Sequence, residues 1–262
     1  MARTFWTTRP TFHVDPVNGD DSNDGIALPF KTIAGAYKAL KSKHDFGDNS
    51  PIVQLADGNY YAGPDGYVLF AFGTPVGAEL IKIVGNMAHP ENVKIWADAL
   101  MPAIYLRDHA ILQIDGVTFK ASGSYSKAVF NEGQGAVVDI ANCRFDAMPL
   151  GTHLVGNTGG FFNVGGHNYI DGGAYAHLRI SSAVQFSYNG TLTVAGGLEF
   201  RDASNNRGPF AQVADGARLY GGVTVDGAGA GSNTVATKYQ VINATLISDG
   251  TVWPGDVSGT IS

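Results

Sequence analysis

The sequence predicts an all-β fold, a single-stranded right-handed parallel β-helix with a short N-terminal capping helix. Short apolar segments separated by turn residues fill the chain from Pro51 onward. One of these segments recurs after an offset of 26 residues, a spacing typical of one solenoid coil. Helical periodicity is confined to a stretch that ends at Leu40, where it can cover the open end of a solenoid.

The repeat assigns the inner and outer faces of two neighbouring coils. ILQIDGVTFKA at residues 111–121 matches VVDIANCRFDA at residues 137–147. Neighbouring coils bury each other's apolar sides, so matching apolar positions are expected inside. The inward pairs are Leu112 over Val138, Ile114 over Ile140, Val117 over Cys143 and Phe119 over Phe145. The outward pairs are Gln113 over Asp139, Thr118 over Arg144 and Lys120 over Asp146, the last an ion pair worth roughly 0 to 1 kcal/mol.

The N-terminal segment combines a strand, a long turn and a helix. Phe12 to Val14 alternates as a short strand does, and residues 15–25 are rich in Asp, Asn and Gly, which turn the backbone. Residues 31–40 place Ile33, Ala36, Tyr37 and Leu40 at spacings of three and four. We expect this amphipathic helix to cap the first coil.

Two sequence words in this segment resemble those of a known family. V-D-x-x-x-G-x-D-x-N-D-G at residues 14–25 and P-F-K-T-I at residues 29–33 are similar to the words that begin the β-helix part of many bacteriophage spike and tail-fibre proteins. The tail, ATKYQVINATLISDGTVWPGDVSGTIS, resembles segments that follow or end the β-helix in prophage spikes. The resemblance implies a homotrimer located in a virion, extracellular after lysis, with bacterial surface polysaccharide and other virion proteins as partners.

We expect one β-helix domain over residues 1–262. Residues 1–44 form the strand, turn and capping helix, and residues 45–262 form the coils. The stretch between Ala147 and His177 is rich in Gly, and we interpret it as one irregular coil with a protruding loop over residues 148–176. Leu154–Val155 and Phe161–Val164 are the candidate strands of this coil.

Composition restricts the partners. The net charge of −6 and the lack of a basic run disfavour nucleic acid and anionic membranes. The apolar stretch from Val68 to Gly85 contains Pro75, Glu79 and Lys82, so membrane insertion is not expected. Residues 1–10 lack the apolar core of a signal peptide. Cys143 is the single cysteine, which excludes an intrachain disulfide and a cysteine-type zinc site.

The polar clusters favour structure over metal or cofactor binding. Acidic and amide side chains alternate between Asp15 and Asp24, but Lys31 occupies the place where an EF-hand-type loop needs a Glu. We therefore predict turn formation, no metal and no cofactor. His153, His167 and His177 are too widely spaced for a local metal motif and are expected to form hydrogen bonds.

An enzymatic alternative needs acids placed around a glycosidic bond. A lyase of the pectate type pairs acids with a basic residue that abstracts a proton, and Asp139, Arg144 and Asp146 are the best local constellation for it. The same three residues fit inter-coil ion pairs equally well. Glu132, Asp171, Glu199 and Asp202 are further acids, for which we favour a solvated-surface interpretation.

Aromatic side chains carry the binding hypothesis, because sugar C–H faces pack on aromatic rings. The candidates, which lie in turns or at polar-flanked positions, are Trp96, Tyr125, Tyr169, Tyr175 and Tyr188. The leading hypothesis is a virion spike or fibre protein that binds bacterial surface polysaccharide without cleaving it. The alternatives are a polysaccharide lyase or glycoside hydrolase on the same fold, and a structural decoration or adaptor protein of the virion.

Overall fold

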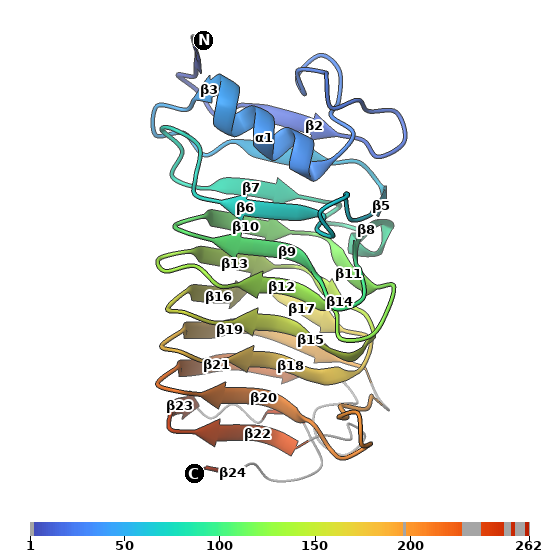
Figure 1. The fold of residues 1–262 in the computed structure, drawn as a ribbon, viewed down its shortest axis with the longest axis vertical. Helices are drawn as coiled ribbons and strands as arrows, with labels where there is room; N and C mark the ends of the chain where they lie inside the picture. The colour runs from blue at the N-terminus through green and yellow to red at the C-terminus, as the bar shows by residue number, and fades with distance from the viewer. Residues whose placement is uncertain (1–2, 196–197, 227–236, 249–252, 255–259, 262) are drawn as a thin grey trace.

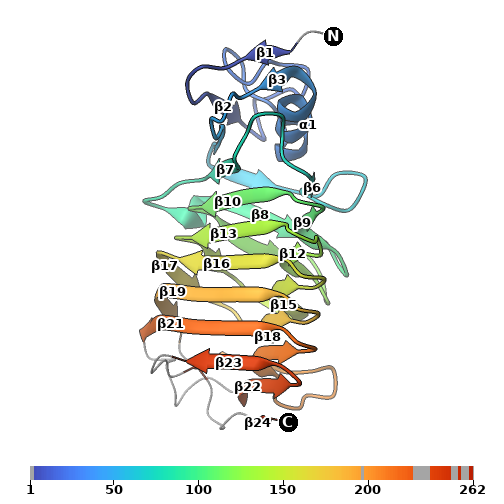
Figure 2. The same cartoon turned by 90° about the vertical axis from the view of Figure 1, so that its left-hand side faces the viewer.

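The computed structural model describes residues 3–195, 198–226, 237–248, 253–254 and 260–261, and these residues form a parallel β-helix (Figure 1). The chain visits three strand positions in turn and then begins the next coil one strand spacing further along the axis. All pairings between the named strands are parallel, as the sequence predicts. β1 (Thr4–Phe5) and α1 (Ile33–Lys43) lie at one end of the stack, and β22 (Thr237–Ile242) lies at the other (Figures 1 and 2).

The strands form three faces. The first face contains β2 (Thr11–Val14), β4 (Ile52–Leu55), β7 (Ile81–Val84), β10 (Ile111–Asp115), β13 (Val137–Ala141), β16 (Phe161–Gly165), the first half of β19 (Gln185–Val194), the first part of β21 (Arg218–Asp226) and β23 (Thr245–Ser248). The second face contains β5 (Gly58–Tyr60), β8 (Val93–Ala97), β11 (Thr118–Ala121), β14 (Arg144–Phe145), β17 (His167–Ile170) and the second halves of β19 and β21. The third face contains β6 (Leu69–Phe72), β9 (Pro102–Arg107), β12 (Lys127–Asn131), β15 (Met148–Gly156), β18 (Ala174–Ile180), β20 (Pro209–Ala214), β22 (Thr237–Ile242) and β24 (Thr260–Ile261).

The first two faces belong to one 14-stranded sheet, and the third face is a separate 8-stranded sheet. The join is β19, which pairs with β16 along its first half and with β17 along its second half. In earlier coils a corner interrupts the chain between these two positions. Figure 2 shows the strands of the first face stacked in order.

The predicted register and core are confirmed. β10 pairs with β13 so that Ile111 lies opposite Val137, the predicted offset. The eight predicted inward residues are all buried. The Phe119 and Phe145 rings stack with centroids 5.5 Å apart, and full burial of such a side chain contributes about 1.5–3 kcal/mol.

The outward face is confirmed with one correction. Lys120 Nζ lies 2.5 Å from Asp146 Oδ2, which is the predicted ion pair. Thr118 was expected to be exposed, but it is only 5% exposed. The 3₁₀ helix η1 (Pro90–Asn92) covers it, and the Thr118 hydroxyl donates to the Pro90 carbonyl at 2.8 Å. A loop from an earlier coil therefore hides a side chain that its own strand turns outward.

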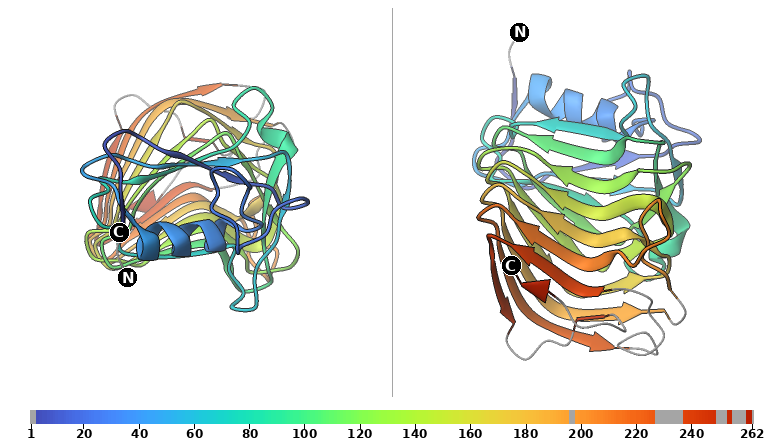
Figure 3. Two further views of the ribbon diagram at one scale, coloured as in Figure 1. Left: turned by 90° about the horizontal axis from the view of Figure 1, so that it is seen from above. Right: turned by 60° about the horizontal axis from the view of Figure 1, so that its bottom comes forward.

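The predicted helix is α1 (Ile33–Lys43), and its four predicted apolar residues are buried. It begins at the N-cap Thr32, whose hydroxyl accepts the Gly35 N–H at 2.8 Å. α1 packs on β6, the first strand of the third face (Figure 3). Tyr37 and Lys41 donate to the carbonyls of Gly73 and Phe72. Because β6 has no strand above it, these bonds satisfy backbone groups at the open edge of that face.

A small layer beside α1 completes the N-terminal end. β1 (Thr4–Phe5) pairs with β3 (His44–Asp45). Trp6 and Phe46 both pack against Phe12, and the Trp6 indole N–H donates to His44 Nδ1 at 3.0 Å. These aromatic contacts cover the apolar end of the solenoid, as a terminal cap must.

The predicted protruding loop over residues 148–176 is wrong. This stretch contains β15, β16, β17 and the start of β18, and it forms a coil of the stack whose register shifts once, in β15. Its glycines mark close contacts between coils: a Cβ on Gly151 would lie 2.1 Å from the Ser126 oxygen, and one on Gly172 would lie 2.0 Å from the Ala147 nitrogen. Glycine here makes room for a neighbouring backbone, whereas the sequence pattern alone suggested a loop.

Candidate functional site

Of the three candidate lyase residues, one lies on the first face and two lie on the second. Asp139 lies on the first face and accepts the Asn163 side-chain N–H at 2.7 Å. Arg144 lies on the second face, and its Nε donates to Asp171 at 2.8 Å. Asp146 pairs with Lys120. A corner at residues 142–143 turns the chain from one face to the next, and it separates Asp139 from Arg144 and Asp146. The Asp171 N–H donates to the Phe145 carbonyl, so Asp171 lies in register beside Asp146.

The other acids considered as catalytic candidates are also engaged. The Tyr105 hydroxyl donates to Glu132, and Arg201 Nε lies 2.9 Å from Glu199. The Asp202 carboxylate accepts the N–H groups of Ser204 and Asn206 within its own turn. Across the described ranges, no cluster of three or more His, Cys, Asp or Glu side chains is arranged to hold a metal ion.

The N-terminal carboxylates form turns, as predicted. Asp15 accepts the N–H of Asn18, and Asp24 accepts those of Ile26 and Ala27. These hydrogen bonds lower the pKa of both acids, because the ionised carboxylate is the better acceptor. The backbone N–H of Asn18 has the largest effect on Asp15, and that of Leu28 has the largest effect on Asp24. Asx turns of this kind account for the Asp- and Asn-rich composition.

Two of the predicted hydrogen-bonding histidines lie in the core with Tyr188. His153 Nε2 contacts the Asp146 carbonyl at 3.0 Å, so this nitrogen carries the proton. His153 Nδ1 is then an acceptor, and His177 Nδ1–H donates to it at 3.0 Å. His177 Nε2 in turn accepts from the Tyr188 hydroxyl at 3.3 Å. Each link fixes the next, so both rings are neutral.

Burial determines the protonation of the hydrogen-bonded side chains His153, His177 and Tyr188. Burial lowers the pKa of His153 to about 4 and lowers that of His177 well below its ordinary value. Tyr188, a predicted glycan-binding residue, is 0% exposed. That prediction is wrong because Tyr188 lies inside the long strand β19 with its side chain inward, whereas the sequence suggested a turn. His167 lies elsewhere, on the second face, with Nε2 at 2.7 Å from the Thr193 hydroxyl.

Trp96 and Tyr169 lie on the second face with their ring faces already in contact with neighbours. Trp96 stacks with Tyr61 of the coil above at 5.9 Å between centroids, and Lys120 of the coil below lies 5.4 Å from the ring centre. Tyr169 stacks with His167 at 4.4 Å, and the Arg144 guanidinium lies 4.9 Å from its ring centre. Both rings are half-buried. Neither offers an open platform to a sugar.

Tyr125 and Tyr175, in contrast, come together in a surface cleft of about 280 Å³, which we call the lateral cleft. Within the described residues neither ring stacks on another ring or on a cation, and Tyr125 is 46% exposed. The lateral cleft is lined by Tyr125, Lys127, Leu150, Gly151, Thr152, Tyr175, Arg179, Asp202 and Ala203. The structure thus selects two of the five predicted aromatic residues as a joint surface.

The coil geometry explains why these residues meet. The cleft lies where the chain enters the third face, and β12, β15 and β18 are neighbours there. Leu100, Tyr125 and Leu150 take the same place in three coils with φ of 68°, 61° and 55°. This left-handed corner turns the Tyr125 side chain outward. A bulge in β15 lies between Met148 and Thr152, and Leu150 and Gly151 within it line the cleft together with the two tyrosines.

An exposed aromatic ladder on the third face was missed by the sequence reasoning. It consists of Tyr67, Phe70, Phe72, Tyr105 and Phe130. Phe70, Tyr105 and Phe130 occupy one register column, and the last two rings stack at 5.2 Å with an interplanar angle of 7°. The rings present mainly their edges because their faces cover one another. Applying the coil spacing to Tyr105 and Phe130 would have revealed the column.

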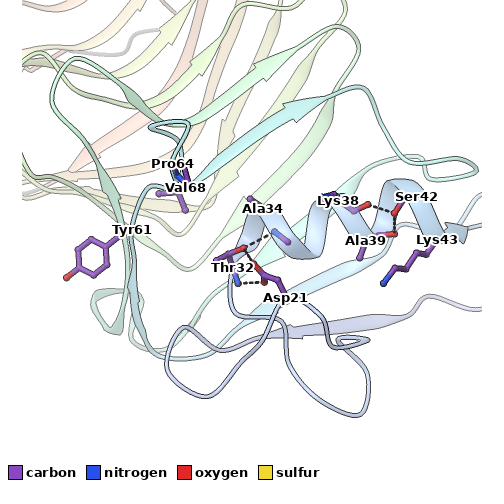
Figure 4. A pocket seen from close by; sticks show the side chains of 12 residues that line it. Asp21, Thr32, Ala34, Lys38, Ala39, Ser42, Lys43, Tyr61, Pro64 and Val68 are labelled. Atoms are coloured by element: carbon purple, nitrogen blue, oxygen red, sulfur yellow. Dashed lines mark hydrogen bonds between the residues drawn. The ribbon is translucent and has the colours of Figure 1, made fainter.

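A second cleft, of about 500 Å³, lies beside α1 (Figure 4). Its polar groups are largely used by the fold. Figure 4 shows Asp21 bonded to Thr32 at the start of the helix, and Ser42 bonded to backbone carbonyls near its end. Lys38, Lys43 and Tyr61 also line this N-terminal cleft.

Comparisons with protein-family models, with curated proteins and with solved structures found no match to this chain. The class of the molecule is therefore defined by its own structure, a parallel β-helix with an aromatic and basic cleft on its side. In the part of the chain that the structure describes, no helix has the length and apolar character to cross a membrane.

Proposed function

We propose that this protein is a spike or fibre protein of a phage or phage-like virion, and that it attaches the particle to a bacterium by binding surface polysaccharide. One observation carries the proposal: Tyr125 and Tyr175 both line the lateral cleft, and no ring or cation of the described residues stacks on either. Aromatic rings on a rigid β-surface pack against the apolar C–H faces of sugars. The cleft spans three coils, which suits a polymer better than a single small molecule.

Whole-cell binding tests this proposal even while the glycan is unidentified. The fluorescently labelled protein is incubated with encapsulated bacteria and with isogenic strains that lack the surface polysaccharide. Binding is expected only where the polysaccharide is present, and Tyr125→Ala/Tyr175→Ala should abolish it. Tyr61→Ala, which truncates a 63% exposed tyrosine on the second face, is the matched control and should bind normally. Equal binding to the polysaccharide-deficient strains would refute the proposal.

Binding without cleavage is part of the proposal. The acids considered as catalytic candidates are each engaged in an ion pair or a hydrogen bond, which supports this reading. The alternative is a polysaccharide lyase or glycoside hydrolase. The chain length of a bound polysaccharide, followed by size exclusion during incubation, distinguishes the two. Shortening of the polymer would replace the binding proposal with the enzymatic one.

We also propose that the chain forms a homotrimer through the aromatic ladder. Phe70 and Phe72 are 41% and 51% exposed, so they leave apolar surface on one flat face. Because the ladder offers ring edges, it suits packing against protein more than stacking on sugar. Light scattering after size exclusion should give three times the 27.5 kDa chain mass. Phe70→Glu/Phe72→Glu should give the monomer mass, and an unchanged mass would show that the ladder is not the interface.

A second candidate function is that of a structural decoration or adaptor protein bound to another virion protein. The N-terminal cleft supports it, because this is the larger of the two clefts and lies at the capped end of the solenoid. An adaptor would bind a purified particle component through this end and would show no binding to cells. Lys38→Glu/Lys43→Glu should then weaken particle binding, while variants of Tyr125 and Tyr175 should not.

A further inference from the structure

Two basic side chains line the lateral cleft without an acidic partner. Lys127 comes from β12 and Arg179 from β18, two coils further along. Among the described residues, neither forms an ion pair with a carboxylate. Elsewhere on the described surface, Lys120, Arg144 and Arg201 each have one, whereas Lys82 and Lys94, like the two cleft residues, have none. The cleft thus holds uncompensated positive charge in a chain whose net charge is −6.

The surroundings of Lys127 show that this charge is not neutralised locally. Its Nζ donates to the Leu100 carbonyl at 3.3 Å, which leaves further N–H groups available. Burial, and after it the positive charge of Arg179, lower the pKa of Lys127. Both cations line the same cleft, so their like charges repel each other there. An anionic group between them would relieve the repulsion and accept hydrogen bonds from both.

The one carboxylate at the cleft does not serve that purpose. Asp202 accepts the N–H groups of Ser204 at 2.9 Å and of Asn206 at 2.7 Å, and also the Asn206 side-chain N–H at 3.0 Å. Its carboxylate therefore holds the turn at residues 202–206 and makes no ion pair with Lys127 or Arg179. A ligand that supplies its own carboxylate meets donors which the protein has left open.

We propose that the lateral cleft recognises acidic sugars, with the carboxylate of a hexuronate unit held by Lys127 and Arg179 and a sugar face packed on Tyr125 or Tyr175. This inference rests on the proposed function and narrows it to uronate-containing polysaccharide. A neutral glycan offers Lys127 only uncharged oxygen acceptors, whose hydrogen bonds are weaker than those of a carboxylate. A uronate supplies both an apolar face and the compensating charge.

The test uses oligosaccharides with a neutral twin. Oligomers of galacturonate, of mannuronate with guluronate, and of glucuronate are titrated into the full-length protein by calorimetry, beside the same oligomers with the carboxyl groups reduced to alcohols. At least one acidic oligomer should bind about tenfold or more tightly than its reduced twin at about 50 mM salt, with the gap narrowing as salt rises. Lys127→Met/Arg179→Gln should remove the difference. Met retains most of the packing of the Lys127 stem.

A control variant with the same change in net charge distinguishes binding at the cleft from general electrostatic attraction. Lys82→Met/Lys94→Met changes the net charge by the same amount with residues of β7 and β8, which do not line the cleft; the preference for the acidic oligomer should persist. If an acidic oligomer and its reduced twin bind equally and Tyr125→Ala/Tyr175→Ala abolishes both, the uronate inference is refuted and the glycan-binding function stands. If no uronate oligomer binds, the inference is also refuted, and whole-cell binding decides separately whether attachment stands.

Discussion

Acid should destabilise this β-helix from the inside, through His153 and His177. Both rings are buried and neutral in the folded chain, and they protonate more readily once the chain unfolds. Burial lowers the pKa of His153 from 6.5 to about 4. The unfolded state therefore binds more protons between these two values, so stability is full above pH 6.5 and falls as the pH decreases toward 4.

The size of the effect follows from the shift. Protonation linkage of His153 alone costs about 2 kcal/mol at about pH 5 and about 3 kcal/mol below about pH 4. His177, whose pKa is lowered as well, adds to this loss. Guanidinium unfolding followed by fluorescence at about pH 7.5 and about pH 5 measures the difference in the free energy of unfolding.

Variants assign the loss to these two residues. His153→Gln/His177→Gln removes both titrating rings, so the drop between the two pH values should shrink by about 2 kcal/mol or more relative to the parent. His109→Gln, at an exposed position, is the control and should keep the parent's pH dependence. An equal drop in the parent and in the double variant would refute the reasoning.

Three further predictions concern the core, the N-terminal cap and the buried hydrogen bonds of His153, His177 and Tyr188. Phe119→Ala or Phe145→Ala should each lower the free energy of unfolding by roughly 3–5 kcal/mol. Phe130→Ala, on the outer face, should lower it by much less. Similar unfolding curves for all three variants would contradict the assignment of inward and outward side chains. Removal of the residues before Ile33 removes β2 and leaves the edge of β4 unpaired, so the truncated protein should aggregate and scatter light. A soluble and equally stable truncation would contradict the capping role. Tyr188→Phe leaves His177 Nε2 without a donor and should cost about 1–3 kcal/mol in urea unfolding at neutral pH, whereas no loss would contradict the hydrogen-bonded chain.

The coil period explains how much of the fold was predictable. The repeat from Ile111 to Val137 fixed which side chains of those coils point inward, because stacked coils repeat both register and face. The helix was equally readable from Ile33, Ala36, Tyr37 and Leu40. The coil at residues 148–176 was not, since glycine at a close backbone approach and glycine in a loop look the same in sequence. The predicted exposure of Thr118 was wrong for a different reason, because the segment that covers this side chain comes from another coil.

The sequence predicted that tyrosines would form the candidate site, but not which of them are exposed and lie together. Exposure of Tyr125 and burial of Tyr188 depend on whether each residue falls in a corner or inside a strand. In the coil of Tyr188, β19 runs without a corner from the first face into the second. Tyr125 and Tyr175 meet because they belong to coils that are two apart, which the period could have shown. Part of the C-terminal tail that resembles prophage spikes lies outside the described residues, so the structure does not bear on that portion.

The most direct measurement is binding of the labelled protein to an array of purified bacterial surface polysaccharides, with Tyr125→Ala/Tyr175→Ala alongside. The account predicts strong binding to one or a few polysaccharides and loss of that binding in the variant, while the circular dichroism and melting temperature of the variant match those of the parent. Binding that survives in the variant would place the glycan elsewhere on the molecule. No binding to any polysaccharide would contradict the attachment function itself.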